Sequence, residues 1–247
     1  MKNNRLVLPE LFTAEFSEPL PETRLLLLLS GRAPNADWLT ECLASYRLWC
    51  ADGGINLCKS SQLVPERLIG DGDSASPEAW AWAKEQNIIM QQYPSDKDLT
   101  DLQLALQIMG QTCGPAAVVL TGAWGGRFDH TFSNVMSLIW SREWGIYPVA
   151  VADEQEVMVF LNGPAAITIK EWQRLPNVIS LMALDGMCTG VSISGVRWPL
   201  DNVTLTQHQP YAISNRLGTG DFTVKVKSGW LGVYFTFEQK PSGLVIT

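Results

Sequence analysis

Two aspartates separated by one glycine form the most specific chemical pattern in the 247-residue chain, in the segment Gly70-Asp71-Gly72-Asp73-Ser74. If the segment is extended, Asp71 and Asp73 face the same side roughly 7 Å apart, so both carboxylates can bind one hard cation. The glycine spacing also fits a dinucleotide fingerprint, but carboxylates there would repel a pyrophosphate unless a metal intervened. The alternative is a solvated acidic turn.

A second acidic segment runs from Tyr93 to Asp101, at the predicted start of a helix. The helix dipole accounts for one or two carboxylates there, but not for all of Asp96, Asp98 and Asp101. The excess indicates a shared Mg²⁺ site, because Mg²⁺ typically takes one or two carboxylates and leaves its other positions to water and phosphate oxygens. Lys97, inside this segment, either contacts a phosphate or offsets the charge of its neighbours.

A glycine-rich segment, Gly122 to His130, follows a predicted strand and precedes a helix. Its glycines let the backbone approach a ligand, and the helix N-terminus together with Arg127 supplies positive potential for a phosphate. The chain contains no G-x-x-x-x-G-K-[ST] motif, so this is not a Walker A loop. With only His130 and His208, a histidine-based zinc site is disfavoured, and we expect His130 to begin the helix rather than to act in catalysis.

Three further polar segments carry weaker signals. Asp52-Gly53 follows a short predicted strand, and taken alone it favours a turn. Trp198 and Ser214-Asn215 lie in polar loops of the second half, where a tryptophan is more often core than ligand platform. The residues together indicate an acidic, metal-ready cleft with a phosphate loop. This predicts a nucleotide-dependent phosphoryl transferase or a metal-dependent phosphohydrolase.

The elements that must position these residues change character along the chain. Four continuously apolar runs predict strands buried on both faces: Leu25–Leu29, Val118–Leu120, Val149–Val151 and Val157–Leu161. Helices alternate with them, one beginning at Ser76-Pro77 and one at a capping box, Thr100 to Gln103. We therefore predict an α/β N-terminal domain with a mainly parallel sheet, residues 1–162, with the acidic loops at the edge of the sheet where ligands usually bind.

Alternation at period two replaces this pattern after about Gly163. Apolar residues alternate with polar ones at Ile167 and Ile169, Val191 and Ile193, and Val224 and Val226. This predicts an all-β sandwich C-terminal domain, residues 163–247. Residues 1–20 allow no prediction.

Composition excludes several classes of protein. The net charge is −7, so a dedicated binder of nucleic acid or anionic membrane is disfavoured. Apolar runs are short against the roughly 18 residues of a membrane span, and the N-terminus lacks the features of a signal peptide, so we expect a cytoplasmic protein. The five cysteines form no C-x-x-C pair, which predicts buried, reduced thiols.

In their order along the chain, these motifs resemble the thiamine pyrophosphokinase family over roughly residues 25–235. The motifs that carry the resemblance are Ala51-Asp52-Gly53-Gly54, Gly70-Asp71-Gly72-Asp73-Ser74, Asp98-x-Thr100-Asp101, Gly125-Gly126-Arg127-Phe128-Asp129-His130, Gly195-x-x-Trp198-x-Leu200 and Ser214-Asn215. The resemblance implies Mg²⁺-dependent transfer of the β,γ-diphosphoryl group of ATP to the hydroxyl of thiamine, giving thiamine diphosphate and AMP. It also implies a homodimer with active sites at the subunit interface.

The resemblance further implies roles for particular residues. The metal would be held by Asp71, Asp73 and Asp101, and the catalytic set would add Asp98 and Arg127. Contacts with ATP would come from Asp52, Gly53, Asp71, Thr100, Gly126, Arg127 and Asp129. Thiamine would be bound by Trp198, Ser214 and Asn215. Asp71 and Asp98 both fit the role of a base for the thiamine hydroxyl. The alternatives are a related pyrophosphokinase for another heterocyclic alcohol such as a pterin, a metal-dependent nucleotide phosphohydrolase, or a sensor without catalysis.

Overall fold

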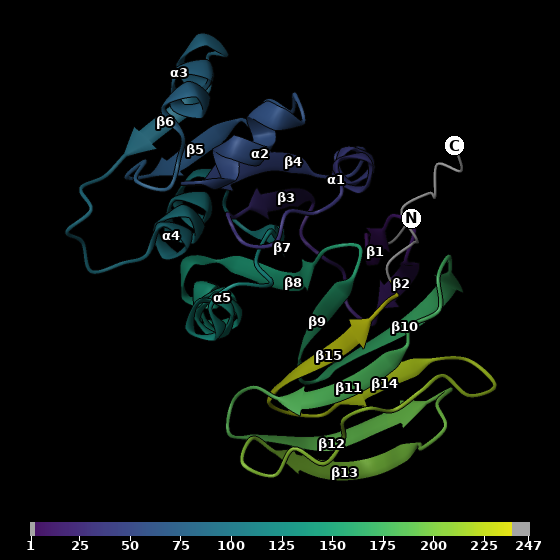
Figure 1. The fold of residues 1–247 in the computed structure, drawn as a ribbon. Coiled ribbons are helices and arrows are strands. Elements are labelled where there is room, and N and C mark those ends of the chain that lie inside the picture. Colours follow the sequence, from purple (N-terminus) through teal and green to yellow (C-terminus); the bar gives the residue numbers. More distant parts are fainter. Residues whose placement is uncertain (1–2, 239–247) are drawn as a thin grey trace, which may run out of the picture.

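The computed structural model describes residues 3–238, which form a nine-stranded and a six-stranded sheet (Figure 1). The larger sheet has the order β11-β15-β9-β8-β7-β3-β4-β5-β6, and six adjacent strands at one end of it pair in parallel. These strands are β3 (Thr23–Leu28), β4 (Arg47–Ala51), β5 (Arg67–Gly70), β6 (Ile89–Gln92), β7 (Ala116–Thr121) and β8 (Ile146–Ala152). The predicted α/β fold with a mainly parallel sheet is confirmed.

Helices cover both faces of the parallel strands. Along β3, Leu26 and Leu28 pack in one core cluster with α1 (Ala36–Cys42), α2 (Gly54–Ser60) and α3 (Pro77–Glu85). Leu25 and Leu27 pack in the other core cluster with α4 (Asp101–Cys113) and α5 (Phe128–Trp140). A 3₁₀ turn, η1 (Ser141–Trp144), follows α5. Burial on both faces explains the uninterrupted apolar runs.

Two helix starts follow the predicted caps. The hydroxyl of Ser76 accepts the N–H of Ala79, with Pro77 in the first turn of α3. Thr100 and Gln103 cap α4 reciprocally: the Thr100 hydroxyl accepts the N–H of Gln103, whose side chain accepts the N–H of Thr100. The capping box fixes where the Asp101 side chain leaves the backbone, because Asp101 is the first residue of α4.

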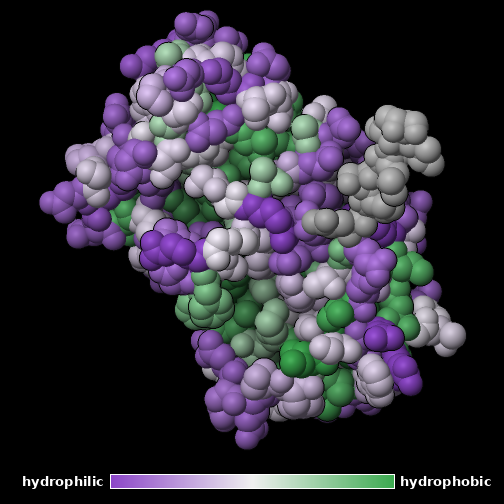
Figure 2. Space-filling model, viewed as in Figure 1, coloured by the Kyte–Doolittle hydropathy of each residue, from purple (hydrophilic) through white to green (hydrophobic). Residues whose placement is uncertain are grey.

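The larger sheet continues into the β-rich half through antiparallel strands. Its strand β9 (Glu156–Asn162) pairs with β8 and with β15 (Trp230–Thr236), and β15 pairs with β11 (Val178–Ala183). The predicted strand at Val157–Leu161 is therefore present but antiparallel to its neighbours. The face shown in Figure 2 is mostly hydrophilic over α3 and β6, and hydrophobic residues gather over the β-rich half.

The second sheet has the order β1-β2-β10-β14-β12-β13 and packs on these antiparallel strands. Its strands are β1 (Arg5–Leu8), β2 (Phe12–Phe16), β10 (Ala165–Trp172), β12 (Met187–Ser194), β13 (Leu200–Thr206) and β14 (Thr223–Val226). Phe12 and Phe235 meet between the sheets with ring centroids 5.4 Å apart. The predicted β-sandwich and its period-two strands are confirmed, since Ile167, Val191 and Val224 are buried.

The N-terminal hairpin β1–β2, for which the sequence allowed no prediction, belongs to the second sheet. Strand β2 pairs with β10, so this part of residues 1–162 lies in the β-rich half of the molecule. The boundary between residues 162 and 163 stays a prediction.

Helix length and the state of the cysteines can be compared with the predictions from composition. Between residues 3 and 238, none of the helices has both the length and the apolar character that a membrane span requires. All five cysteines are free, and four of them are buried. The prediction of unpaired thiols is confirmed.

Candidate active site

A cleft of about 640 Å³ opens at the carboxyl ends of the parallel strands. Four of the six parallel strands lead to a predicted segment in it: Asp52 follows β4, Asp71 follows β5, Asp101 begins the helix after β6, and Gly126 lies in the loop after β7. The carboxyl ends of parallel strands share one sheet edge, so segments far apart in the sequence meet here. The lining also includes Asp73, Lys97, Asp98, Thr100, Arg127 and His130.

Three carboxylates converge in this cleft. Asp52, Asp71 and Asp101 each offer an oxygen, and these oxygens lie within 4.8 Å of one another. Asp52 is buried, with a backbone φ of 42°, and its carboxylate accepts the N–H of Gly72 at 3.2 Å. Oδ1 of Asp101 is buried, and the ammonium of Lys97, 3.3 Å away, is the contact that it makes in place of a well-formed hydrogen bond. Three converging carboxylate oxygens, one of them buried with a single long ionic contact, are the ligands that a hard divalent cation prefers, so the donor set fits a metal ion.

Lys97 lies between two of these carboxylates. Its Nζ is 2.6 Å from Oδ2 of Asp71 and 3.3 Å from Oδ1 of Asp101. The hydrogen bond from Lys97 lowers the pKa of Asp71, aided by the N–H of Asp73. Burial raises the pKa of Asp101, and the charges of Asp71 and Asp52 add to that rise against the opposing effect of Lys97. Asp71 is therefore held ionised, whereas Asp101 carries a charge that its surroundings do not fully compensate.

The remaining predicted acidic residues lie at the rim of the cleft. Asp73 is exposed, and its carboxylate accepts a hydrogen bond from the Ser74 hydroxyl at 3.0 Å. Asp98 is also exposed. Asp73 thus lines the cleft without joining the converging trio, in which Asp52 is the third member. The side chain of Thr100 serves the capping box of α4.

The glycine-rich loop forms the opposite wall. Gly125 and Gly126 have positive φ angles of 76° and 69°, and a Cβ on Gly126 would meet nothing within 4 Å. Arg127 precedes α5 and is exposed, as is Asp129, and the two side chains pair with Nη2 2.5 Å from Oδ2. Glycine backbone, a helix N-terminus and an arginine in one place form an anion-binding arrangement. His130 lies in the first turn of α5, as predicted.

Sequence reasoning missed the group that anchors this loop, which centres on Arg32 in the segment after β3. The N–H of Arg32 donates to the carbonyl of Trp124, and its guanidinium pairs with Asp153 at 2.7 Å and with Glu156 at 3.3 Å. Asp153 is almost wholly buried. The position of Arg32 just beyond a predicted strand was the available signal. Its partner lies 121 residues away, so no local pattern could indicate the pair.

A second hollow of about 420 Å³ lies in the β-rich half, between β11, β12, β13 and the segment before β14. It contains Trp198, Ser214 and Asn215, and the indole of Trp198 is 53 % exposed. The Asn215 side chain holds the backbone of Trp198: Oδ1 accepts its N–H at 3.2 Å and Nδ2 donates to its carbonyl at 2.7 Å. The structure therefore brings the three residues predicted to bind thiamine together, with Asn215 positioning Trp198.

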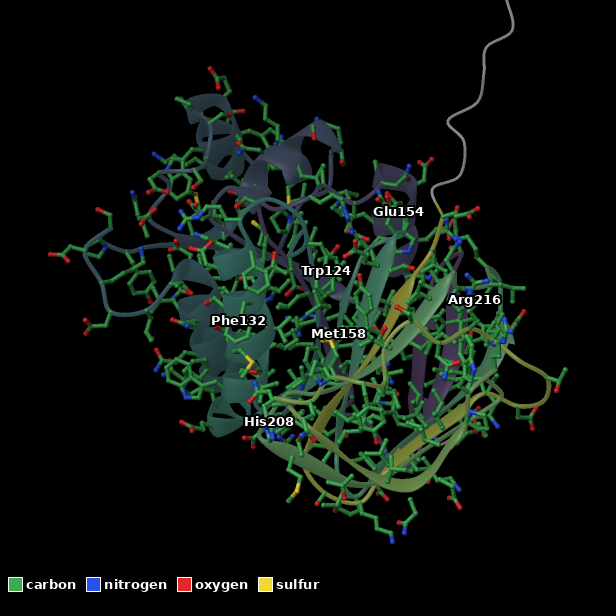
Figure 3. The ribbon with its side chains drawn as sticks, turned by 60° about the horizontal axis from the view of Figure 1, so that its bottom comes forward. Trp124, Phe132, Glu154, Met158, His208 and Arg216 are labelled. Atoms are coloured by element: carbon green, nitrogen blue, oxygen red, sulfur yellow. The ribbon has the colours of Figure 1, made fainter. Side chains whose placement is uncertain are left out.

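The two hollows are separate within one chain. Among the described residues they have no lining residue in common. In Figure 3, Phe132 on α5 and Arg216, the neighbour of Asn215, lie on either side of Met158.

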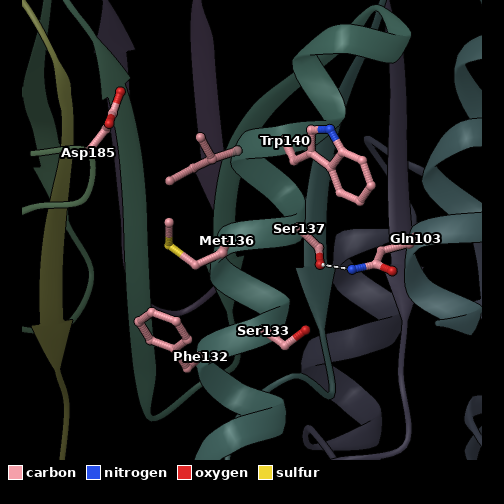
Figure 4. A pocket seen from close by; sticks show the side chains of 8 residues that line it. Gln103, Phe132, Ser133, Met136, Ser137, Trp140 and Asp185 are labelled. Atoms are coloured by element: carbon pink, nitrogen blue, oxygen red, sulfur yellow. Dashed lines mark hydrogen bonds between the residues drawn. The ribbon is translucent and has the colours of Figure 1, made fainter. Parts of the chain in front are cut away.

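An apolar hollow of about 510 Å³ lies beside the cleft on α5 (Figure 4). Phe132, Met136 and Trp140 follow one another at four-residue spacing along its wall, and Phe132 and Trp140 are large side chains left exposed. Phe128, one turn earlier, is 81 % exposed. Contiguous exposed apolar side chains of this kind mark interaction surfaces more often than isolated ones do.

Comparison with known proteins identifies similar chains over most of this sequence. Residues 41–147 match a family model described as thiamin pyrophosphokinase, catalytic domain, and residues 166–231 match one described as its vitamin B1 binding domain. A thiamine pyrophosphokinase of Bacillus subtilis is 26 % identical over 180 residues, 72 % of this chain and 82 % of that protein.

Solved structures show the same fold. A crystal structure of thiamine pyrophosphokinase from Bacillus subtilis superposes with a TM-score of 0.75 at 21 % identity, covering 88 % of this chain and all of the other. That of the yeast thiamin pyrophosphokinase gives a TM-score of 0.68 at 14 % identity, covering 87 % and 86 %.

Proposed function

Because the chain belongs to the thiamin pyrophosphokinase family, we propose that it transfers the β,γ-diphosphoryl group of ATP to the hydroxyl of thiamine, giving thiamine diphosphate and AMP. The observation that carries the proposal is the cleft in which Asp52, Asp71 and Asp101 converge opposite the glycine-rich loop. Phosphoryl transfer needs positioning and charge neutralisation more than a covalent nucleophile, and these residue types supply both.

Mg²⁺ is the metal that we assign to this cleft, held by Asp71 and Asp101 with Asp52 or Asp73. When bound there, it would neutralise the charge of the polyphosphate. The exposed N–H groups at the start of α5, Gly126 and Arg127 bind phosphate oxygens from the other wall. To do so, Arg127 exchanges its surface partner Asp129 for phosphate, at little cost because exposed ion pairs contribute little.

Thiamine binds in the Trp198 hollow under this proposal. The exposed indole offers a flat surface for the aminopyrimidine ring, and its π face attracts the cationic thiazolium. Arg197 already stacks on this indole, with its guanidinium carbon 4.8 Å from the ring centroid.

Replacing Trp198 by Ala is expected to weaken thiamine binding by about 1–3 kcal/mol, as loss of an aromatic stacking platform does. ATP affinity should change little, because Trp198 does not line the acidic cleft. Calorimetric titration with each ligand measures both, and Trp198→Phe should retain most of the thiamine affinity. If Trp198→Ala unfolds or binds thiamine normally, the ring belongs to the core or lies outside the site.

A homodimer completes the proposed site. The acidic cleft and the Trp198 hollow have no described lining residue in common, which supports a second copy bringing their ligands together. The exposed apolar side chains of Phe128, Phe132 and Trp140, beside the cleft, support a protein interface there. Each site would then take its carboxylates from one protomer and its indole from the partner. A cytoplasmic location stays a prediction.

The product assay tests the function. Purified protein with ATP, Mg²⁺ and thiamine should form thiamine diphosphate, detected by chromatography after oxidation to its fluorescent derivative. A pterin alcohol in place of thiamine should give no diphosphorylated product. Phosphate released to water without modified thiamine would instead establish a phosphohydrolase.

A further inference from the structure

Lys97 occupies the position that a cation would take in the acidic cleft. Its ammonium contacts Asp71 and Asp101, two of the three residues whose oxygens converge, and its side chain is only 14 % exposed. It lies between β6 and α4, in a segment that also lines the cleft. The ammonium is therefore part of the site rather than a surface charge.

An ammonium and a divalent ion compete for these two carboxylates. Two cations sharing the same carboxylate oxygens would lie next to each other, where solvent screens their repulsion poorly because the site is recessed. A metal ion that binds Asp71 and Asp101 therefore favours displacement of Lys97 from the two carboxylates. The displaced ammonium then needs another anion.

A nucleoside triphosphate supplies that anion in the same cleft. Lys97 and the loop with Gly126 and Arg127 line one cavity, so phosphates bound by the loop would occupy the cavity that Lys97 also lines. With phosphates present, the lysine can leave the carboxylates without losing a counter-charge. In their absence, displacement leaves it unpaired in a recessed site.

We propose that Lys97 is an internal counter-cation that makes divalent metal binding depend on the nucleotide. It neutralises Asp71 and Asp101 while the cleft holds no nucleotide, and it moves to the polyphosphate when metal and nucleotide enter together. Binding of free metal is then weak, and metal and nucleotide bind cooperatively. The inference rests on the proposed function in taking the nucleotide to be ATP.

The test measures binding of Mn²⁺ alone, by electron paramagnetic resonance, to the full-length protein. Lys97→Met and Lys97→Gln should bind free Mn²⁺ at least about tenfold more tightly than wild type, because the competing cation is gone. Lys97→Arg keeps the charge and should resemble wild type. Lys84→Met, which removes an exposed lysine of α3, controls for net charge and should also resemble wild type.

A non-hydrolysable ATP analogue supplies the second arm. It should tighten Mn²⁺ binding to wild type far more than to Lys97→Met. Unchanged or weaker free Mn²⁺ binding in both uncharged variants would overturn the proposal, as would an equal gain in Lys84→Met. The binding measurement needs no thiamine. A wild-type protein that makes no thiamine diphosphate would refute the proposed function alone. An active enzyme whose Lys97 variants bind free Mn²⁺ as wild type does would refute this inference alone.

Discussion

Asp101→Asn is expected to lower kcat about 100- to 1,000-fold, the loss typical when one preorganised group that stabilises transition-state charge is removed. Asp71→Asn should have an effect of the same order, because both carboxylates converge on the position that we assign to the metal. Thiamine affinity should be nearly unchanged, since neither residue lines the Trp198 hollow. Steady-state kinetics at saturating Mg²⁺ separates kcat from KM.

The melting temperature of Asp101→Asn distinguishes a loss of catalysis from a loss of folding stability. Burial and the neighbouring carboxylates raise the pKa of Asp101, so its charge is destabilising in the folded protein without metal. Asp101→Asn removes that charge, and its melting temperature should not fall. Asp96→Asn is the matched control: Asp96 is exposed in the same segment and is not among the residues that line the cleft. An Asp101→Asn enzyme as fast as Asp96→Asn would remove Asp101 from the catalytic machinery.

Mixing two impaired variants is expected to restore activity if each site is built by two protomers. An Asp71→Asn subunit supplies an intact Trp198, and a Trp198→Ala subunit supplies an intact Asp71. Each mixed dimer then contains one complete site and one doubly altered site. Random pairing makes half the dimers mixed, so recovery should approach about a quarter of wild-type sites.

The mixing experiment needs proof of exchange. Differently tagged subunits should co-purify after incubation, and size exclusion should show a dimer. The matched control mixes Asp71→Asn with Asp101→Asn, which lie in the same cleft of one chain and should not complement. Suppose that exchange is proven and the mixture is no more active than the two variants assayed separately. The acidic cleft and the indole of Trp198 would then not form a site shared between two protomers.

The sequence predicted features that depend on neighbours in the chain. The capping box at Thr100, the cap at Ser76 and the loops after β5 and β7 all follow from local patterns, and parallel strands bring such loops to one edge. Strand direction was not predictable for β9. Val157 packs in one core cluster and Met158 in the other, and a strand buried on both faces has the same apolar run in either direction.

Other features depend on contacts between distant residues. Strand β2 pairs with β10 about 150 positions later, so the N-terminal segment carried no local signal of its place. Asp52 turns into the cleft because its backbone adopts a positive φ, and the pattern Asp-Gly alone fits an ordinary turn equally well. Asp73 has the spacing for a metal ligand, but the turn after β5 exposes it.

Phosphorus NMR of the reaction distinguishes transfer of an intact diphosphoryl group in one step from two successive phosphoryl transfers. As thiamine is consumed with ATP and Mg²⁺, we expect AMP and thiamine diphosphate to appear together in equal amounts from the first time points. ADP appearing in step with thiamine monophosphate would contradict it, because successive single phosphoryl transfers would then make the product.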